Sequence, residues 1–521
     1  MGLPTGSELL GLLRLARDLR PFSSSTLTPE ICDDLVRARM RTRELRLIAL
    51  LDRVVFSNPR SPYFKLMNMA GAQAEDVRGL IASEGVEAAL AVLGRQGIRV
   101  SWEEFKGRTP VVRGSARLDV DPSDFDNPVT KPFLVGTSGG TSGGAVRVAT
   151  DLEYITECAP NWGVWLEALG LRSRPLVFWA PTHTGLANRY LLCAKLGLPY
   201  RKWFAMADMR TPFDRLRSRV VHRICQAALG LPRAVTADLG QSAVVMSYLA
   251  DLAEAGEPPM INTSPSAAVK ISTEAVVAGR SLDGVAFLLG AEPVTPDRRE
   301  AMEAAGALCV PTYGTSESGW IGAHFTGDTE HDEVRVFRDA YAVLPSVERP
   351  EALEFTSLIT AAHKILLNVE LGDSAVITEG AGGEPAERWG YDLTLHTIRT
   401  FRKITSFGVT FAVADLYPIL EKQLPQRFGG TVGDYQLEEC QDTKGTAEIL
   451  LRISPELGPV DDKLVIDELL SAISATQDHY GPMADMLRDA DALVVRRERP
   501  RLTAAGKVFP VLPAAGSSNS R

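Results

Sequence analysis

Hydrophobic and polar positions change their spacing twice along the chain, and these changes divide it into three stretches. In the first stretch, residues 31–55 carry apolar side chains three and four positions apart, which is the spacing of one helix face. We expect helices over residues 1–105, broken near Pro59. Nothing in this stretch indicates chemistry, and we interpret it as a helical layer that covers the rest of the protein.

The second stretch, residues 130–400, alternates short β-branched runs with helical spacing. The predicted elements are strands at 176–179, 285–290 and 308–313 and helices at 188–196 and 296–305. Such alternation is typical of α/β proteins with buried strands, in which ligands bind where strands end. We therefore expect an α/β fold whose binding residues directly follow strands.

In the third stretch the spacing of the apolar residues changes again. Alternating apolar runs at 404–414, 447–453 and 492–495 are separated by two stretches with helical spacing. This pattern favours a small α+β domain. We therefore predict a large N-terminal domain over residues 1–401 and a small mobile C-terminal domain over residues 402–521.

Composition and charge narrow the function classes. The chain has 521 residues, 45% of them hydrophobic and 23% charged, and a formal net charge of −9. These values are typical of a globular protein with two or more domains. The negative charge argues against nucleic acid as a partner. Any polyanionic ligand should therefore be small and bound by a local group of residues.

The cysteines and apolar runs indicate a cytoplasmic protein. The six cysteines form no C-x-x-C pair, so neither a disulfide framework nor a zinc site is expected. No apolar run is long enough to cross a membrane, and the N-terminus lacks the basic segment of a signal peptide. Gly2 does not begin a myristoylation signal, because Gly6 stands where serine or threonine is required.

A segment rich in glycine and hydroxyl groups lies between two strand-like runs. Its residues are Ser138, Gly139, Gly140, Thr141, Ser142 and Gly143. Glycines let backbone N–H groups approach a ligand and the hydroxyls add donors, so the loop suits a polyphosphate. The alternatives are a plain linker and a nucleophile elbow on Ser138, although an elbow should turn straight into a helix. The Gly-Lys-Ser/Thr ending of a Walker loop is absent.

Residues 138–143 resemble the S-S-G-T-T-G signature of the acyl-adenylate-forming superfamily. Two later stretches, at 290–293 and 313–319, each follow a predicted strand and read G-A-E-P and Y-G-T-S-E-S-G. In this order they resemble the G-A-E-P and Y-G-x-[ST]-E motifs of the phenylacetate–CoA ligase branch. The resemblance covers residues 40–510, with the specific matches in six short stretches.

The resemblance implies an ATP site at these strand ends. Tyr313 would stack on adenine, or would be a buried strand-end aromatic, and Thr315 or Ser316 would contact phosphate. Gly290, Ala291 and Glu292 would form the wall of the adenine pocket. The two motifs together assign to nucleotide binding Gly290, Ala291, Glu292, Pro293, Tyr313, Gly314, Thr315 and Ser316.

Glu317 is the candidate metal ligand and a candidate catalytic residue. A carboxylate beside a phosphate loop either repels ATP or holds the magnesium ion that bridges to it. Magnesium prefers one or two carboxylates together with phosphate oxygens. The resemblance implies that Glu317 binds Mg²⁺, and the alternative is a solvated loop glutamate.

Two further stretches resemble family motifs with departures. Asp373 stands in a segment similar to Y-R-x-G-D and would accept hydrogen bonds from the ribose hydroxyls, but the usual aromatic residue and arginine are missing. Arg399 takes the arginine position of the G-R-x-D hinge and would face ribose or phosphate. Phe401 or Arg402 replaces the hinge acid, which puts the pivot of the C-terminal domain in question.

The last stretch, residues 499–507, resembles the C-terminal P-R-x-x-x-G-K segment of the family. Lys507 would neutralise charge on the carboxylate and the α-phosphate as they meet, which makes it a candidate catalytic residue. The alternative is a solvated lysine near the tail.

The acyl pocket is less clear from the sequence. His183 occupies the position where the family has an aromatic or histidine wall, and it would orient the carboxylate or be an ordinary loop histidine. Trp179, Trp203 and Phe204 would line a pocket for an aromatic acid, or would be core residues.

The resemblance implies an AMP-forming ligase that acts on small carboxylic acids. ATP and the acid would give acyl-AMP and pyrophosphate with Mg²⁺ as cofactor, and coenzyme A is the first choice of acceptor. An amine acceptor would make the protein an amide synthetase of natural-product biosynthesis. A serine hydrolase using Ser138 or Ser142 is the alternative from another class. We expect a monomer or homodimer with no nucleic-acid or membrane partner.

Overall fold

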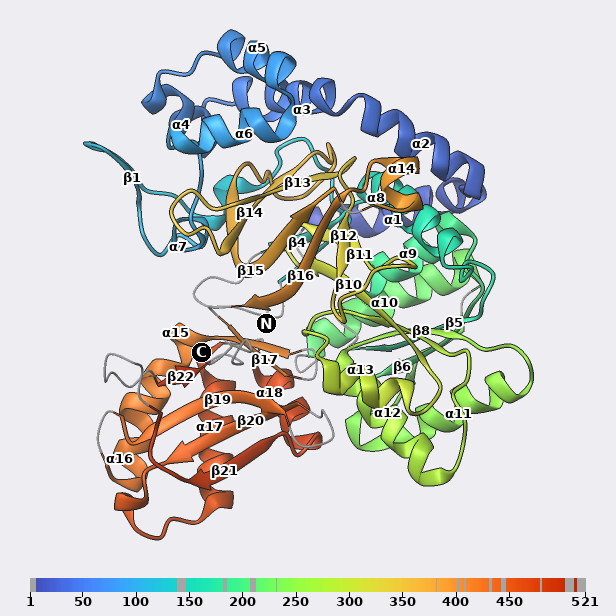
Figure 1. Cartoon of the computed structure of the whole chain (residues 1–521), viewed down its shortest axis with the longest axis vertical. Helices are drawn as coiled ribbons and strands as arrows, with labels where there is room; N and C mark the ends of the chain where they lie inside the picture. Colours follow the sequence, from blue (N-terminus) through green and yellow to red (C-terminus); the bar gives the residue numbers. More distant parts are fainter. Residues whose placement is uncertain are drawn as a thin grey trace.

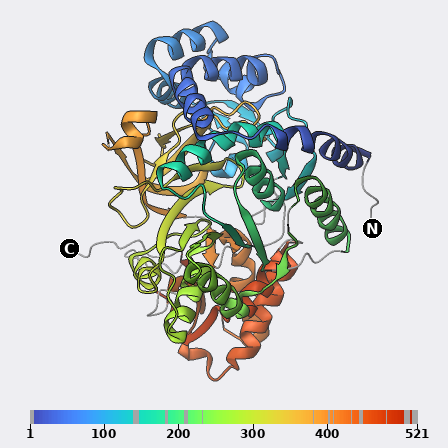
Figure 2. The ribbon, with the colours of Figure 1, turned by 90° about the vertical axis from the view of Figure 1, so that its right-hand side faces the viewer.

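The computed structural model describes residues 6–137, 147–180, 185–206, 212–230, 232–380, 382–400, 403–406, 409–430, 433–441, 447–477, 480–501 and 510–512. It is an α/β structure with a large sheet-rich part and a smaller C-terminal part, which confirms the predicted fold class. In Figures 1 and 2, N-terminal helices lie at one end of the molecule and the C-terminal elements at the other. None of the described helices is long and apolar enough to span a membrane.

Residues 6–105 are helical, as predicted. The helices are α1 (Gly6–Ser24), α2 (Pro29–Arg41), α3 (Arg43–Leu51), the π-helical turn η1 (Asp52–Phe56), α4 (Pro62–Ala70), α5 (Ala74–Glu84), α6 (Val86–Arg95) and α7 (Trp102–Phe105). The side chain of Thr28 caps α2, and Ser101 and Glu104 form a capping box around α7. The buried faces of these helices join the main hydrophobic core, as expected for a covering layer.

Twelve strands of the described chain form one sheet in the order β13-β14-β15-β16-β12-β11-β10-β9-β8-β5-β6-β7. Their bounds are β5 (Leu176–Ala180), β6 (Tyr200–Ala205), β7 (Val235–Thr236), β8 (Met260–Thr263), β9 (Ala286–Leu289), β10 (Leu308–Thr315), β11 (Gly319–Ala323), β12 (Val334–Val336), β13 (Tyr341–Pro345), β14 (Ala352–Ser357), β15 (Val369–Glu379) and β16 (Leu393–Thr400). From β7 to β10 neighbours pair in parallel, and from β10 to β13 they pair antiparallel. The carboxyl end of β10 therefore marks the change between the two halves.

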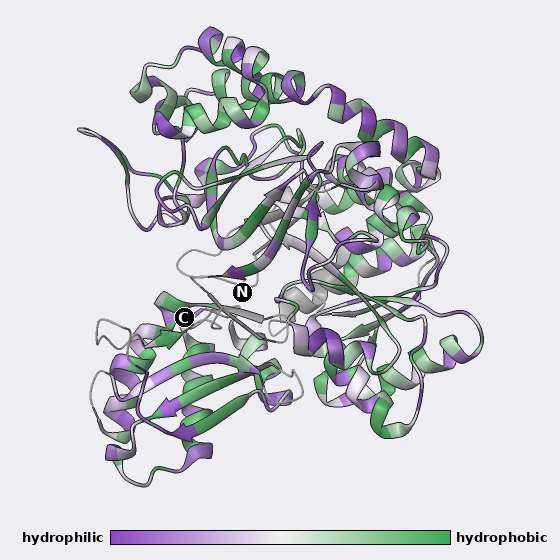
Figure 3. Cartoon of the chain, viewed as in Figure 1, coloured by the Kyte–Doolittle hydropathy of each residue, from purple (hydrophilic) through white to green (hydrophobic). Residues whose placement is uncertain are grey.

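Helices cover both faces of the parallel half. They are α8 (Leu152–Ala168), α9 (Gly185–Leu196), α10 (Pro212–Leu229), α11 (Ser242–Glu254), α12 (Pro265–Ala278) and α13 (Pro296–Glu303), and α14 (Glu384–Trp389) precedes β16. Phe178 and Leu288 share a core with α8 and α9, whereas Val177 and Phe287 share a second core with α11 and α12. Adjacent residues of a strand face opposite sides, so each strand serves both cores. Figure 3 shows the hydrophobic strands between these helices.

Two hairpins flank the helical layer and the sheet. One joins β1 (Val111–Arg113) to β2 (Ala116–Leu118), and the 3₁₀ turn η2 (Pro122–Phe125) follows it. The other joins β3 (Leu134–Thr137) to β4 (Arg147–Thr150) in antiparallel register. This second hairpin confirms the predicted pair of strands around the glycine-rich loop.

The smaller C-terminal part contains a four-stranded sheet in the order β21-β20-β19-β22. Its elements are β17 (Lys403–Ser406), β18 (Val409–Ala412), α15 (Val413–Pro418), η4 (Ile419–Gln423), α16 (Leu424–Phe428), β19 (Tyr435–Gln441), β20 (Ala447–Ile453), η5 (Pro455–Leu457), α17 (Asp462–Thr476), α18 (Tyr480–Asp489), β21 (Leu493–Arg497) and β22 (Val511–Leu512). The Thr295 hydroxyl donates to Gln441 Oε1 at 2.9 Å, and Lys270 Nζ donates to the Ala490 carbonyl at 3.1 Å. The C-terminal part therefore rests against the side of the large part that carries α12 and α13 (Figure 1).

Candidate functional site

Several residues predicted for the site lie outside the described residues. They are Ser138, Gly139, Gly140, Thr141, Ser142, Gly143, His183 and Lys507. The strands on either side of the glycine-rich loop are described and run antiparallel, with Thr137 opposite Arg147. Their pairing brings the two ends of the loop together, as a loop that cradles a ligand requires.

Tyr313 and Asp373 come together although 60 residues separate them. The Tyr313 hydroxyl donates to Asp373 Oδ2 at 2.8 Å, and both side chains are buried. Burial, and secondarily the negative charge of Asp373, raise the pKa of Tyr313 well above its usual value, so the phenol keeps its proton. The pair places two residues from separate predicted motifs at one point.

This contact also shows how the sheet is shaped. β11, β12 and β16 lie between β10, which carries Tyr313, and β15, which carries Asp373. Neighbouring strands are about 4.8 Å apart, so a flat sheet would hold the two side chains far from each other. The antiparallel half must therefore curl back over the end of β10. Gly372 supports the bend with φ of +88°, a conformation that costs glycine little.

Glu317 is buried in the turn between β10 and β11, and its partner was not predicted. Lys106 Nζ donates to Glu317 Oε1 at 2.7 Å, and the two side chains are only 1% and 5% exposed. Lys106 directly follows α7, which contacts β15. The helical layer, for which the sequence indicated no chemistry, thus ends in a charged group that neutralises the candidate metal ligand.

The turn that carries Glu317 is held from several directions. The Thr315 and Ser318 hydroxyls lie 2.9 Å apart, and Ser318 N–H donates to Thr315 Oγ1 at 3.1 Å. Tyr154 and Tyr341 both donate to the Ser318 carbonyl, at 3.4 and 2.5 Å. The Thr315 hydroxyl is therefore used within the turn, whereas Ser316 is exposed at its tip.

Close approach of the strands explains the glycines in this motif. A Cβ on Gly314 would lie 2.3 Å from the Gly319 carbonyl oxygen, and a Cβ on Gly319 would lie 1.8 Å from the Tyr154 hydroxyl. Gly319 also has φ of +82°. Any larger residue at either position would displace the turn that holds Glu317.

The segment 290–293 follows β9, as predicted, but its side chains divide between two roles. Ala291 has φ of +71°, a left-handed conformation that costs energy for a residue with a Cβ and clusters at functional sites. The Glu292 side chain turns away and pairs with Arg298 at 3.0 Å. It also accepts from the Ser266 N–H at the start of α12. Glu292 therefore anchors the segment, and the backbone at Gly290 and Ala291 remains as the candidate pocket wall.

Arg399 is the penultimate residue of β16 and lies opposite Ser374 on β15, whereas Asp373 lies opposite Thr400. Its Nη1 is 3.2 Å from Asp332 Oδ2, and the same carboxylate accepts from the N–H groups of Thr397 and Ile398. Asp332 thus fixes both the backbone and the guanidinium at this point. Arg399 is therefore paired with Ser374 and Asp332 and not with Asp373, and the ion pair occupies part of the guanidinium.

The aromatic residues considered for an acyl pocket are core residues. Trp179, Trp203 and Phe204 are at most 1% exposed, and the two indole N–H groups donate to backbone carbonyls. Trp179 and Phe204 join the core beneath α11 and α12, whereas Trp203 joins the other core. The sheet separates them, so they do not line one pocket.

His363 lies beside the site and makes stability depend on pH. Its ring is 5.2 Å from that of Tyr154, and neither ring nitrogen, both buried, has a hydrogen-bond partner among the residues that the structure describes. Burial, with the charge of Lys364, lowers the pKa of His363 to about 4. Unfolded histidine has a pKa of about 6.5. Between pH 4 and pH 6.5 this histidine is protonated in the unfolded chain and neutral in the folded protein. The free energy of unfolding therefore falls as the pH decreases through this range.

We expect the His363→Phe variant to lose less stability on acidification than the wild type. The contribution of neutral His363 to the free energy of unfolding is complete above pH 6.5 and declines toward pH 4, by at most about 3 kcal/mol. Urea unfolding at pH 7.5, 6, 5 and 4.5 measures the slope. Parallel pH profiles for the two proteins would show that His363 titrates normally in the fold.

Comparison with known proteins bears on the fold. No protein-family model and no curated protein matches the chain. Among solved structures, 2-hydroxyisobutyryl-CoA ligase in complex with 2-HIB-AMP and CoA aligns with a TM-score of 0.54 and 15% identity, over 94% of this chain and 91% of that chain. The amide bond synthetase McbA from Marinactinospora thermotolerans aligns with a TM-score of 0.39 and 14% identity, over 76% and 70%. The second score is too low to carry an argument, and the first shows that the chain has the fold of 2-hydroxyisobutyryl-CoA ligase.

Proposed function

We propose that the protein is an ATP-dependent ligase that activates a carboxylic acid as an acyl-adenylate and transfers the acyl group to coenzyme A. The observation that supports the proposal is the Tyr313–Asp373 hydrogen bond, which joins two motifs predicted to bind nucleotide, in a chain with the fold of 2-hydroxyisobutyryl-CoA ligase. Glu317 lies four residues beyond Tyr313 and is buried in the same turn region. The phenylacetate–CoA ligase branch remains a proposal that rests on the motifs alone.

The nucleotide would bind across the carboxyl ends of β9 and β10 and the part of β15 that carries Asp373. A carboxylate offers about four acceptor sites, and Tyr313 uses one of those on Asp373. Tyr313 would thereby orient Asp373 toward the ribose hydroxyls and present its ring to adenine. The backbone at Gly290 and Ala291 would close the pocket. Loop residues 138–143 would supply N–H and hydroxyl donors to the phosphates.

Glu317 is the residue that would hold a magnesium ion supplied with ATP. No group of three or more acidic, histidine or cysteine side chains within the described ranges could hold a metal alone. Magnesium keeps several waters and uses one or two carboxylates with substrate phosphates, so one glutamate suffices. Bound there, the ion would neutralise charge on the phosphates. Glu317 would hold it, and Lys106 would fix the orientation of the Glu317 carboxylate.

The first reaction needs no enzyme nucleophile. The acid oxygen attacks the α-phosphorus, pyrophosphate leaves, and catalysis consists of positioning and charge neutralisation. Lys507 would place its ammonium group beside the meeting carboxylate and phosphate, and His183 would orient the carboxylate. The acyl group would then pass from acyl-AMP to the thiol sulfur of coenzyme A, with release of AMP and of the thiol proton, as the domain of residues 402–521 rotates.

An amine acceptor is the second candidate. The family's hinge acid is replaced at Phe401 or Arg402, and Gly144-Ala145 stands where the family often has Lys-Pro. Both departures weaken the case for the movement that forms a thioester. The protein would then be an amide synthetase with the same first half-reaction.

Two measurements test the proposal. Acid-dependent exchange of labelled pyrophosphate into ATP, across a panel of carboxylic acids, reports the first half-reaction. AMP release with coenzyme A, and separately with amino acids or aminoaryl compounds, reports the second, and mass spectrometry identifies the product. Stimulation by an amine alone, with a stable amide, would replace the CoA ligase with an amide synthetase. Absence of exchange with every acid, together with fluorophosphonate labelling of Ser138 or Ser142, would indicate a serine hydrolase.

We expect the Asp373→Asn variant to raise the KM for ATP about 10- to 100-fold. Hydrogen bonds to a charged acceptor contribute about 1.5–3 kcal/mol, and the amide cannot accept from both ribose hydroxyls in the same way. Tyr313→Phe is the matched control, because it removes only the hydroxyl that orients Asp373 and should have a smaller effect. An unchanged KM for ATP in Asp373→Asn would place the ribose elsewhere.

A further inference from the structure

Strand β16 carries one extra residue near its end. Ser374 on β15 pairs with Arg399. Two residues further along β15, Val376 pairs with His396, which lies three residues before Arg399 on β16. This is a β-bulge, which interrupts the ladder of backbone hydrogen bonds and is frequent next to active sites. Thr397, inside the bulge, has φ of +55°. This left-handed conformation is unusual for a β-branched residue and persists only where the surrounding structure holds it.

The side chain of Asp332 holds the bulge. β12 begins two residues after Asp332, and extending its register with β16 places Asp332 opposite Thr397. Oδ1 accepts from the Thr397 N–H at 2.9 Å, and Oδ2 accepts from the Ile398 N–H at 3.2 Å. The side chain is only 4% exposed, so these hydrogen bonds are shielded from water. The carboxylate therefore provides acceptors for backbone groups at the point where the ladder is interrupted.

The same carboxylate fixes Arg399, whose Nη1 lies 3.2 Å from Asp332 Oδ2. The Ser374 hydroxyl donates to the Arg399 carbonyl at 3.3 Å, so the backbone of this residue is held as well. Residues 397–399 are thus all tied to the large part. Arg399 stands four residues before β17, the first strand of the C-terminal part. Figure 1 shows β16 ending beside the elements of that part.

Asp332 is itself held in place from helix α13, which contacts the C-terminal part. Arg299 on α13 donates to the carbonyl of His331, the residue before Asp332, from Nε at 3.3 Å and from Nη2 at 3.0 Å. Thr295 caps the start of α13, and its hydroxyl donates to Gln441 in the C-terminal part at 2.9 Å. The loop that carries Asp332 therefore connects the end of β16 with a helix that touches the C-terminal part.

We propose that Asp332 is a positioning residue of the ligase, which fixes the end of the large part from which the C-terminal part moves between the two half-reactions. The inference rests on the proposed function. The acidic residue of the family's hinge is replaced at Phe401 or Arg402, and Asp332 supplies a carboxylate to the same junction from a distant segment. A fixed end of β16 gives the chain one direction as it leaves the large part, so the C-terminal part returns to the same place at each turnover.

Hydrogen exchange tests the anchoring without any assumption about the substrate. Both oxygens of Asp332 act as acceptors, so the N–H₂ group of Asp332→Asn would face a donor in place of one of them. The amides of Thr397 and Ile398 should therefore exchange at least about 10-fold faster in this variant than in the wild type. The amides of β9 and β10 should exchange at the wild-type rate.

Asp328→Asn is the matched control. Asp328 lies in the same loop, is fully buried and also uses both oxygens, because it accepts from the Phe325 N–H and from Arg335 Nε, each at 2.7 Å. The variant removes a buried carboxylate from an ion pair, as Asp332→Asn does, but these partners lie outside the bulge. Its melting temperature should fall as in Asp332→Asn, while the amides of Thr397 and Ile398 exchange at the wild-type rate.

Steady-state kinetics with an accepted acid test the role in the reaction. In Asp332→Asn, kcat for pyrophosphate exchange and for the complete reaction should fall about 10- to 100-fold, because a misplacement of about 1 Å can cost about 100-fold in rate. The KM values for ATP and for the acid should stay within about threefold of the wild type, because the variant changes positioning and not ground-state binding. Asp328→Asn should keep the wild-type kcat at temperatures well below its melting temperature.

Three results would overturn the inference. One is wild-type exchange of the Thr397 and Ile398 amides in Asp332→Asn. Another is an unchanged kcat in this variant, and a raised KM for ATP beside it would assign Asp332 to nucleotide binding through Arg399. The third is an equal loss of kcat in Asp332→Asn and Asp328→Asn, which would reflect lost stability alone. Failure of every acid to support pyrophosphate exchange is a different outcome, and it would refute the proposed function itself.

Discussion

Acid-dependent pyrophosphate exchange falls by at least about a hundredfold in Glu317→Gln, corresponding to about 3 kcal/mol of transition-state stabilisation. Glutamine keeps the size of the side chain and removes the anionic oxygen that would bind magnesium. The defect should deepen as magnesium becomes limiting and recover in part at high magnesium. Exchange in Glu317→Gln at the wild-type rate under limiting magnesium would refute the role of Glu317 as metal ligand.

Because Lys106 pairs with Glu317, the experiment needs a control for protein stability. The single variant weakens a buried ion pair, and loss of one partner of such a pair typically costs about 3–5 kcal/mol of stability. A fall in activity could therefore reflect a fall in the folded fraction. Lys106→Met/Glu317→Gln removes both charges, so its melting temperature should recover toward that of the wild type while exchange stays low. Recovery of exchange together with stability would mean that Glu317 is structural.

The local pattern of residues was sufficient to predict several elements. Alternating β-branched runs predicted β5, β9 and β10, and the run on each side of the glycine-rich loop predicted the β3–β4 hairpin. The placement of 290–293 at the end of β9 was predicted correctly too. These features depend on neighbours in the sequence, because strand formation and tight turns are set by a few consecutive residues.

Contacts between distant segments could not be predicted in the same way. Lys106 lies 211 residues before Glu317, and no spacing rule connects a lysine that directly follows a short helix with a glutamate in a distant turn. The pairing of Glu292 with Arg298 was local, six residues apart, yet the family motif directed attention to the adenine wall. Arg399 likewise belongs to a motif, but its partner Asp332 becomes visible only when β12 and β16 are paired.

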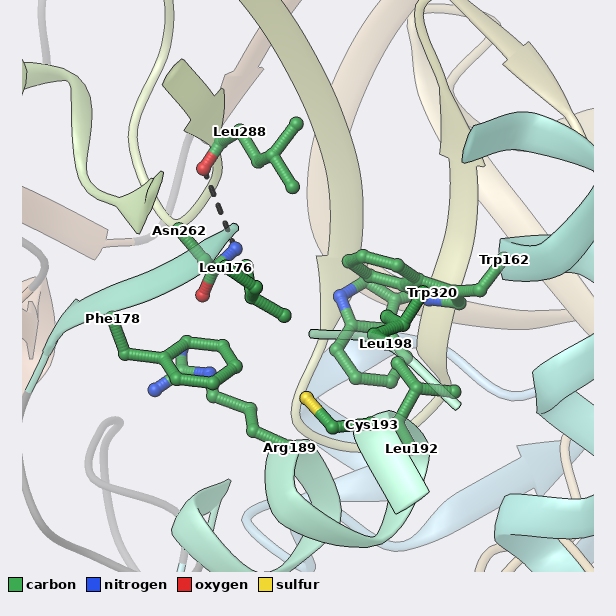
Figure 4. Close-up of a pocket in the computed structure, with 10 residues that line it drawn as sticks. All are labelled: Trp162, Leu176, Phe178, Arg189, Leu192, Cys193, Leu198, Asn262, Leu288 and Trp320. Atoms are coloured by element: carbon green, nitrogen blue, oxygen red, sulfur yellow. Dashed lines mark hydrogen bonds between the residues drawn. The ribbon is translucent and has the colours of Figure 1, made fainter. Parts of the chain in front are cut away.

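The burial of Arg189 is another feature that the sequence did not predict. On a helix of mixed polarity an arginine is normally solvated, so the sequence gives no reason to single it out. Its burial follows from the way α9 lies against Phe178 and Trp203. Whether such an arginine is buried can therefore be seen only in the tertiary structure (Figure 4).

Removal of Lys507 should separate the two half-reactions. We expect Lys507→Ala to lower adenylation by about 10²–10³-fold, the range found when a donor aimed at developing negative charge is deleted. Acyl transfer from supplied acyl-AMP to the acceptor should change less than about threefold, because the charge that Lys507 neutralises is already gone. The residues on either side are anchored to β19: Arg501 N–H donates to Gln436 Oε1 at 2.8 Å, and Leu437 N–H donates to the Pro510 carbonyl at 2.8 Å.

The control for this experiment is Arg499→Ala, which removes a positive charge from the same segment. Arg499 is 80% exposed and pairs with Glu456 on the surface of the C-terminal part, so its loss should leave both half-reactions near the wild-type rate. Pyrophosphate exchange measures the first step, and single-turnover transfer from synthetic acyl-AMP measures the second. Equal losses in the two steps for Lys507→Ala would mean that the lysine is structural. They would also count against a C-terminal domain that delivers Lys507 for adenylation and withdraws it for acyl transfer.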